Sequence, residues 1–352
     1  MQASGKITPA VTVIIPHLRN RPMLDACLDA LRQTTFRDFS VIVVDNGGEA
    51  SDLAGLESSY PDVTVLRLSE NAGYAGGCNA GLRQALSPYV VFLNDDTVVE
   101  PEWLGSLVAA AESDPMIGAL QPKILSLPER RQGRRVFDYA GAAGGLIDRL
   151  GYPYCLGRSF GGREADSGQY DEPRDIFWAS GVALFARREA VERLGGFEES
   201  FFMHMEEIDL CWRMSLVGYR VRSVLQSVVW HEGGASLAEG SPLKVYYNHR
   251  NALLTLLRNR NAAPLIALLP LRLALEAAAL LYYLAGGKEG MARAAQVAQA
   301  FIDVLRGLPE TLRQRREIQR ARIVSDRELF RNAPFSIFLS RRPAQPLARA
   351  SQ

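Results

Sequence analysis

The chain has 352 residues, of which 47% are hydrophobic and 22% are charged, and its formal net charge is +1. These values are typical of a globular protein with a sizeable core and one large or two smaller domains. A net charge so close to zero gives no bulk attraction to polyanions, so we expect no nucleic-acid partner.

The four cysteines lie far apart and form no CxxC pair. This pattern argues against a zinc knuckle or a dithiol redox motif and suits a reducing compartment. Residues 1–9 are polar and lack the apolar core of a signal peptide, so we expect a cytoplasmic protein.

The first half of the chain alternates strand-like and helix-like patterns. Apolar, often β-branched runs predict buried strands at 11–15 (ended by Pro16), 40–45, 62–68 and 88–93. Helical spacing predicts helices at 24–31, 80–86 and 103–111, and a glycine-rich turn is expected at 71–79. Strands that alternate with helices indicate a parallel sheet built from βαβ units.

The pattern weakens in the middle of the chain and then returns. Residues 122–175 are rich in Gly, Arg and Tyr, which predicts a small mixed sheet or long ordered loops. Beyond them we expect strands at 177–185 and 221–230 and helices at 188–194 and 207–217. Both helices are followed by glycine, a common helix stop.

The most apolar stretch is 262–285, whose length approaches that of a membrane span. Arg272 and Glu276 interrupt it at a spacing that allows them to pair on one helix face, and two prolines argue against a straight span. We favour a helix on the membrane surface, or a re-entrant one, over a span; a buried helical hairpin is the third option. The arginine-rich tail after Leu305 favours the anionic cytoplasmic leaflet, so peripheral attachment explains both features.

Polar side chains follow four of the predicted strands: Pro16-His17, Asp45-Asn46, Asn94-Asp95-Asp96 and His231. The carboxyl ends of parallel strands share one edge of a sheet, where ligands bind, so Asp45, Asp96 and His231 are expected to gather there. Adjacent carboxylates repel each other, and a divalent cation relieves the repulsion. An acid with an imidazole suits Mn²⁺, and oxygen ligands suit Mg²⁺. An ordinary Asn/Asp turn and a structural histidine are the alternatives.

Two further segments carry candidate chemistry. The glycine-rich run 71–81 offers backbone N–H groups to phosphates, although it lacks a Walker or dinucleotide signature, and Gly73 and Asn79 would equally suit a tight loop. The segment 201–213 places Glu206, Glu207 and Asp209 in apolar surroundings. Burial raises the pKa of a carboxyl group toward the working pH of a general base. The alternative is that these acids only complement a helix dipole.

In their order and spacing, these motifs resemble the inverting family 2 glycosyltransferases of the GT-A fold, from Val11 to about Leu237. The subtype is similar to rhamnosyltransferase-like enzymes of bacterial cell-surface polysaccharide assembly. The resemblance implies an α/β GT-A domain at 1–240, with a Rossmann-like, mostly parallel sheet flanked by helices. Residues 241–352 would form a helical, membrane-associating extension.

The resemblance also implies roles for individual residues. The nucleotide-sugar donor would be bound by Pro16, His17, Asp45, Asn46, Gly73, Asn79, Asn94 and Asp95. Asp96 and His231 would be ligands of Mg²⁺ or Mn²⁺. Glu207 would be the general base, Glu206 would orient the acceptor, and Asp209 is a rival base. The chain departs from the family pattern at Asn94, which replaces the first acid of the DxD motif, and at Glu207, where aspartate is usual.

The implied reaction is a metal-dependent, inverting sugar transfer at the inner face of the cytoplasmic membrane. The donor would be a UDP- or dTDP-sugar, possibly dTDP-rhamnose, and the acceptor a hydroxyl of a cell-surface glycan or a lipid-linked glycan. Two alternatives come from other classes. The departures at Asn94 and Glu207 would suit a degenerate protein that binds glycans or nucleotide sugars without turnover. A nucleotidyltransferase would need a glycine beside Arg19 and Arg21, and none is present.

Overall fold

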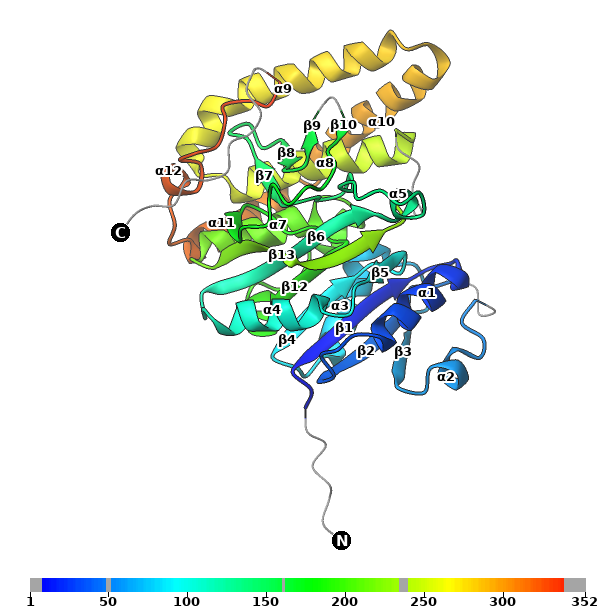
Figure 1. The fold of residues 1–352 in the computed structure, drawn as a ribbon. Coiled ribbons are helices and arrows are strands. Elements are labelled where there is room, and N and C mark those ends of the chain that lie inside the picture. The colour runs from blue at the N-terminus through cyan, green and yellow to red at the C-terminus, as the bar shows by residue number, and fades with distance from the viewer. Residues whose placement is uncertain (1–7, 49–51, 160–161, 234–239, 339–352) are drawn as a thin grey trace.

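The computed structural model describes residues 8–48, 52–159, 162–233 and 240–338. The central sheet has nine strands: β1 Val11–His17, β2 Phe39–Asp45, β3 Val63–Arg67, β4 Tyr89–Leu93, β5 Thr97–Val99, β6 Ile117–Ser126, β11 Arg174–Ile176, β12 Ala183–Arg187 and β13 Arg220–His231. Their order is β11-β13-β6-β12-β4-β1-β2-β3, and β5 pairs with β13 (Figure 1). Two small hairpins pair β7 Gly145–Ile147 with β8 Pro153–Cys155, and β9 Arg158–Ser159 with β10 Gly162–Arg163.

The directions of the strands decide where the site forms. β1 runs parallel to β2 and to β4, and β2 runs parallel to β3. β12 is antiparallel to both β4 and β6, and β13 is parallel to β6. Because the direction reverses at β12 and again at β6, the carboxyl ends of β1, β2, β4, β6 and β13 all lie at one edge of the sheet. The structure therefore brings the polar strand ends together as the sequence predicts.

Helices cover both faces of the sheet and extend beyond it (Figure 1). They are α1 Arg21–Arg32, α2 Leu56–Ser59, α3 Gly73–Gln84, α4 Trp103–Glu112, α5 Leu127–Arg130, α6 Arg188–Arg193, α7 Glu206–Leu216, α8 Pro242–Asn259, α9 Ala262–Leu284, α10 Gly287–Arg306, α11 Leu308–Ala321 and α12 Asp326–Leu329. Alternate residues of a strand face opposite sides, so Val13 and Ile15 join the core with α1 and α4, whereas Ile14 joins the core with α3 and α7.

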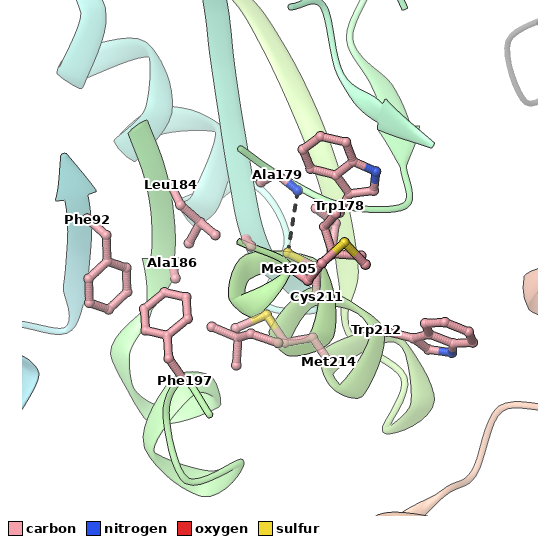
Figure 2. Close-up of a cluster of buried hydrophobic side chains, with 14 of the residues drawn as sticks. Phe92, Trp178, Ala179, Leu184, Ala186, Phe197, Met205, Cys211, Trp212 and Met214 are labelled. Atoms are coloured by element: carbon pink, nitrogen blue, oxygen red, sulfur yellow. Dashed lines mark hydrogen bonds between the residues drawn. The ribbon is translucent and has the colours of Figure 1, made fainter. Parts of the chain in front are cut away.

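Helix α7 is fixed to the sheet by a buried cluster (Figure 2). Phe92 of β4 packs against Phe197 with ring centroids 4.7 Å apart. The backbone N–H of Ala179 donates to the Cys211 sulfur at 3.4 Å, which ties the chain before β12 to α7. This packing holds the start of α7, which carries the acidic pair, beside the sheet.

The glycine-rich segment 71–79 is not the turn that the sequence predicts, because α3 already begins at Gly73. Its glycines allow close packing: a Cβ on Gly81 would lie 2.3 Å from Ile14 Cγ2, and one on Gly77 would lie 3.1 Å from Pro16 Cβ. The gain from packing α3 tightly on β1 outweighs the low helix propensity of glycine.

Three strand predictions also need correction. β1 does not end at Pro16, because Pro16 is still paired with Val44 of β2. Pairing of β1 with β4 ends earlier, at Ile14, so the N–H group that proline lacks is not needed for a hydrogen bond to β4. A long buried strand, β6, occupies 117–126, partly in the region expected to be irregular. The strand expected at 177–185 instead runs from Ala183 to Arg187. The remaining elements agree with the predictions within a few residues.

The close approach of α3 to β1 predicts opposite effects of the same substitution at two helical glycines. Gly81→Ala should lower the free energy of unfolding by about 1–3 kcal/mol, because the new methyl group would overlap Ile14. Gly105→Ala in α4, where the nearest atom lies 3.9 Å away, should leave it unchanged or raise it by up to about 1 kcal/mol. Urea unfolding of both variants measures the difference, and equal effects would contradict the packing described for α3.

Candidate active site

The carboxyl ends of β4 and β13 meet at a buried histidine. His231 Nε2 lies 3.3 Å from Asp96 Oδ1, and its Nδ1 lies 3.0 Å from Asp138 Oδ1. The Asn94 amide nitrogen is 3.5 Å from the same Nε2. Asp138 comes from the region that the sequence left unassigned. The structure thus joins Asp96 and His231, as predicted, and adds an acid that holds the far side of the imidazole.

Electrostatic interactions in this cluster favour the protonated form of His231 and the ionised form of Asp96. Burial lowers the pKa of His231, but Asp96 and Asp138 outweigh this effect and raise the pKa to about 10. Burial raises the pKa of Asp96, but the charge of His231 and backbone N–H donors, including that of Gly233, bring it below its usual value. Without a metal ion, the two groups therefore stabilise each other as an ion pair at neutral pH, and a cation bound at Nε2 would replace its proton.

His17 makes a second bridge at this edge. Its Nδ1 lies 2.6 Å from Asp95 Oδ2, and its Nε2 lies 2.6 Å from Asp52 Oδ2. Burial lowers the pKa of His17, but hydrogen bonds and charges from both acids raise it above the usual value. His17 therefore orients the Asp95 carboxylate. Asp52 was not singled out in the sequence because it lies in a polar segment away from any strand.

Asp45 and Asn46 connect the end of β2 to neighbouring loops. Asp45 Oδ1 accepts a hydrogen bond from the Gly48 N–H at 3.1 Å. Asn46 accepts from the Ala72 N–H at 3.1 Å and donates to the Gly73 carbonyl at 2.8 Å, so its amide fixes the start of α3. Asn46 thus acts inside the protein as a scaffold.

Asn79 lies inside α3, and both ends of its amide have protein partners. It donates to the Phe197 carbonyl at 2.9 Å and accepts from the Phe197 N–H at 2.9 Å. These bonds tie α3 to the segment before α7. The contact between Asn79 and the donor that the resemblance implied remains a prediction.

The acidic pair begins α7 in a different environment. Oε2 of Glu206 and Oε2 of Glu207 are both buried, and neither has a hydrogen-bond partner among the described residues. Burial raises the pKa of Glu206 well above its ordinary value, with the charge of Glu207 adding to the effect. Burial raises the pKa of Glu207 to about 7. A carboxyl group with this pKa is suited to take up a proton near neutral pH.

Hydrogen bonds to the chain before β12 connect the end of β4 with Tyr74 of α3. The Asn94 N–H donates to the Val182 carbonyl at 2.9 Å, and the Tyr74 hydroxyl donates to the adjacent Gly181 carbonyl at 2.5 Å. Burial raises the pKa of Tyr74 well above its usual value, and the charges of Glu206 and Glu207 contribute to the same shift. The acidic pair therefore lies within electrostatic range of Tyr74, whose hydroxyl binds next to the residue paired with the end of β4.

Asp209 differs from its two neighbours because its charge is paired. Its Oδ2 accepts from Arg213 at 2.7 Å and from Arg258 at 3.2 Å, and its Oδ1 accepts from Asn259 at 2.8 Å. Burial raises the pKa of Asp209, but Arg258 and Arg213 outweigh it and hold the pKa below its usual value. This geometry fits a structural anion between α7 and α8 better than a proton acceptor.

A polar cavity of about 200 Å³ lies beside the His231 cluster. Its lining includes Ser126, Asp138, Tyr139, Arg163, Gly233 and Lys244. Close by, burial and the charge of Lys244 lower the pKa of His204 to about 4, so its imidazole is neutral at physiological pH. Sequence reasoning missed Tyr139, Arg163 and His204, since no local pattern distinguishes them.

The residues at the strand ends fit a divalent cation only in combination with outside ligands. No group of three or more His, Cys, Asp and Glu side chains in the described ranges is arranged to hold a metal ion. However, Asp96 Oδ1 is buried without a hydrogen-bond donor. An oxygen of this kind suits Mg²⁺ or Mn²⁺, which commonly take one or two protein ligands and complete their shell with substrate phosphates and water.

The fold is that of the GT-A glycosyltransferases. The structure superposes on "GalNAc-T7 with UDP, GalNAc and Mn2+" with a TM-score of 0.55 and 16% identity, covering 71% of this chain and 48% of the other. It superposes on "Mannosyltransferase PcManGT from Pyrobaculum calidifontis in complex with GDP-Man and Mn2+" with a TM-score of 0.51 and 19% identity, covering 90% and 86%. At these identities the likeness establishes the fold alone.

Sequence comparison identifies the family. Residues 12–183 match the model "Glycosyl transferase family 2". An N-acetylglucosaminyl-diphospho-decaprenol L-rhamnosyltransferase of Mycobacterium tuberculosis is 28% identical over 71% of this chain and 85% of its own length. The O-antigen biosynthesis protein RfbC of Myxococcus xanthus is 28% identical over 68% of this chain, and a pre-mycofactocin glycosyltransferase of M. tuberculosis is 29% identical over 75%.

Residues 12–183 therefore form a family 2 glycosyltransferase domain, and the chain is similar to a rhamnosyltransferase. It spans only 19% of the length of the Myxococcus protein and 51% of that of the pre-mycofactocin enzyme. The match to the family model ends at residue 183, so α7 and its acidic pair lie outside the matched residues.

The environment of Asp209 predicts a large effect on stability. Asp209→Asn should lower the free energy of unfolding by about 3–5 kcal/mol, because Arg213 would remain buried without its carboxylate and Arg258 would keep only Glu198. Glu57→Gln, which breaks the exposed pair between Glu57 and Arg67, should change it little. Denaturant unfolding of both variants checks this, and a fully stable Asp209→Asn variant would show that the buried pairing is not needed.

Proposed function

We propose that this protein transfers a sugar from a nucleotide-diphosphate donor to a hydroxyl group of a glycan or lipid-linked acceptor, with inversion at the anomeric carbon. The observation that carries the proposal is the buried Oε2 of Glu207, which has no hydrogen-bond partner among the described residues and belongs to a carboxyl group whose pKa is raised to about 7. Family membership supports glycosyl transfer over nucleotidyl transfer.

In the proposed reaction, Glu207 accepts the proton of the acceptor hydroxyl while that oxygen attacks the anomeric carbon. The bond between this carbon and the diphosphate oxygen breaks in the same step, and the nucleoside diphosphate leaves with the bonding electrons. A single displacement inverts the configuration. Glu206, kept protonated by burial beside Glu207, would donate a hydrogen bond that orients the acceptor.

The donor is proposed to lie along the strand ends. Asp45 would accept from the nucleotide base, Pro16 and Gly73 would line the base or ribose, and Asp95, held by His17, would bind the ribose or sugar. Asp96 and His231, with Asn94 nearby, would hold Mg²⁺ or Mn²⁺, which when bound neutralises charge on the leaving diphosphate. Both solved structures named above carry Mn²⁺, which supports this choice.

The donor is best identified by a thermal-shift panel of UDP-, dTDP- and GDP-sugars with Mn²⁺. We expect one sugar nucleotide, with dTDP-rhamnose the first candidate, to raise the melting temperature. Asp96→Ala should abolish the metal-dependent part of the shift. Stabilisation by a donor without any transfer or hydrolysis would favour the alternative of a binding protein that lacks turnover. Stabilisation that is equal with and without metal would contradict the role of Asp96.

Removing the proposed base should separate chemistry from binding. Glu207→Gln should lower kcat by about 10²-fold or more, because a general base typically contributes that much. Since the amide is nearly isosteric, donor affinity measured by calorimetry should stay within twofold. In the wild type, kcat/KM should fall as the pH drops below about 7, where Glu207 becomes protonated. A fully active Glu207→Gln variant would rule out this base.

We also propose that the protein attaches to the cytoplasmic surface of a membrane through α9, the one helix in the described residues that is long and apolar enough to cross a bilayer. Its charged residues face inward: Arg272 and Glu276 are each 1% exposed and paired at 2.7 Å. The Arg272 guanidinium stacks 3.6 Å above the Tyr152 ring, and Glu276 also binds His249. A spanning helix would lose these contacts, so a helix lying on the surface fits better.

The outer side of α9 is apolar. Ile266, Leu281 and Tyr282 are 74%, 66% and 77% exposed. The basic tail contributes less free charge than its sequence suggests, because Arg315 donates to carbonyls near the end of α8 and Arg313 pairs with Glu310. Arg341, Arg342 and Arg349 lie outside the described residues. Apolar contact therefore accounts for more of the proposed attachment than charge does.

Membrane attachment is tested by flotation with vesicles of phosphatidylglycerol and phosphatidylethanolamine. Ile266→Glu should reduce the bound fraction about tenfold or more, because it puts a charge in place of an apolar side chain that would insert into the bilayer. The matched control is Leu86→Glu, which changes an equally exposed residue (74%) in the catalytic domain and should bind normally. Equal binding by both variants would place the attachment elsewhere.

A further inference from the structure

The segment before the acidic pair has an unusual backbone. Phe202, His204 and Met205 have φ angles of 63°, 66° and 74°, the left-handed region that non-glycine residues rarely adopt. Met205 directly precedes α7 and Glu206. Strained backbone of this kind persists only where surrounding contacts enforce it, and it often occurs at functional sites.

One side chain of α8 meets three carbonyls of this segment. The Asn251 amide nitrogen lies 3.0 Å from the Phe201 oxygen, 2.9 Å from the Met203 oxygen and 2.8 Å from the His204 oxygen. The side chain is fully buried. An amide has two hydrogens, so the three acceptors share them. The left-handed residues turn these carbonyls to the same side, and Asn251 satisfies them together.

The amide is itself oriented, and the segment is confined from the opposite side. Asn251 Oδ1 accepts from the Arg250 guanidinium at 2.9 Å, which directs the amide nitrogen toward the carbonyls. Across the segment, the Ala75 N–H of α3 donates to the Phe202 carbonyl at 3.2 Å. A Cβ on Gly73 would lie 2.4 Å from this same oxygen. The segment is therefore held between α3 and α8.

We infer that Asn251 is a positioning residue for the carboxylates of Glu206 and Glu207, acting through the left-handed segment Phe202–Met205; this inference rests on the proposed function. Without the amide, the Met203 and His204 carbonyls lose this donor and the Phe201 carbonyl keeps only the Met203 N–H, so the backbone relaxes toward ordinary conformations in which the freed oxygens reach water. The start of α7 then shifts, and both carboxylates move with it. Asn251 lies outside the residues matched by the family model.

The test compares two asparagines of α8 in the full-length protein. Asn251→Ala should lower kcat by about 10²-fold, the scale expected for a small misplacement of a reacting group, while KM for the donor stays within twofold. The acid limb of the pH profile should move to lower pH, because a more solvated Glu207 is easier to ionise. Asn248→Ala, at an exposed position on the same helix, should change neither quantity. A folded Asn251→Ala variant that keeps the wild-type pH profile would overturn the inference.

Hydrogen exchange without substrate separates this inference from the proposed function. The backbone amides of 202–207 should exchange at least tenfold faster in Asn251→Ala than in Asn248→Ala. Unchanged exchange would overturn the positioning role even if the enzyme is active. Absence of transfer by the wild type, with exchange altered as expected, would instead refute the role of the acidic pair as base. If Asn251→Ala does not fold, Asn251→Ser keeps one donor and should give intermediate exchange and kcat.

Discussion

The site depends on β4, β6 and β13 running in the same direction. β12 lies between β4 and β6 and runs antiparallel to both, so that β6 and β13 point the same way as β1, β2 and β4. Consequently Asp96 and His231, which are far apart in sequence, lie 3.3 Å apart at one edge. Had β12 been antiparallel to only one of these two neighbours, the ends of β4 and β13 would lie on opposite edges of the sheet.

The buried ionisable side chains of the site fall into two groups, those paired with an opposite charge and those with unpaired oxygens. We assign a structural role to the first group and a role in proton transfer to the second. His17, His231, Asp96 and Asp209 are each compensated by a charged partner at hydrogen-bonding or ion-pair distance. Glu206 and Glu207 are buried with oxygens that lack such partners. A compensated ion is stable in one protonation state, whereas an uncompensated carboxyl group has a raised pKa and exchanges its proton near neutral pH.

The helices after β13 form the proposed membrane-binding surface and also contact the segment that carries the proposed base. α9 turns Arg272 and Glu276 toward the protein and its apolar side chains outward, the reverse of the usual arrangement. α8 lies between this helix and the site, with His249 bound to Glu276 on one side and Asn251 bound to the segment before α7 on the other. The proposed membrane surface and the proposed base are thus connected through one rigid helix.

The sequence by itself determined strands β1 to β4 and β13, the polar residues at their ends and the four-residue spacing of Arg272 and Glu276, because these are local patterns of apolar and polar side chains. Close packing decided that the glycine-rich segment is a helix, because the tight contact between Gly81 of α3 and Ile14 of β1 outweighs the low helix propensity of glycine. Only the tertiary structure shows that Asp138 contacts His231, that Asp52 contacts His17 and that Asn251 contacts the segment Phe202–Met205. These partners are 35 to 93 residues apart along the chain. No local pattern encodes such contacts, because they exist only once the sheet and α8 have brought distant backbone together.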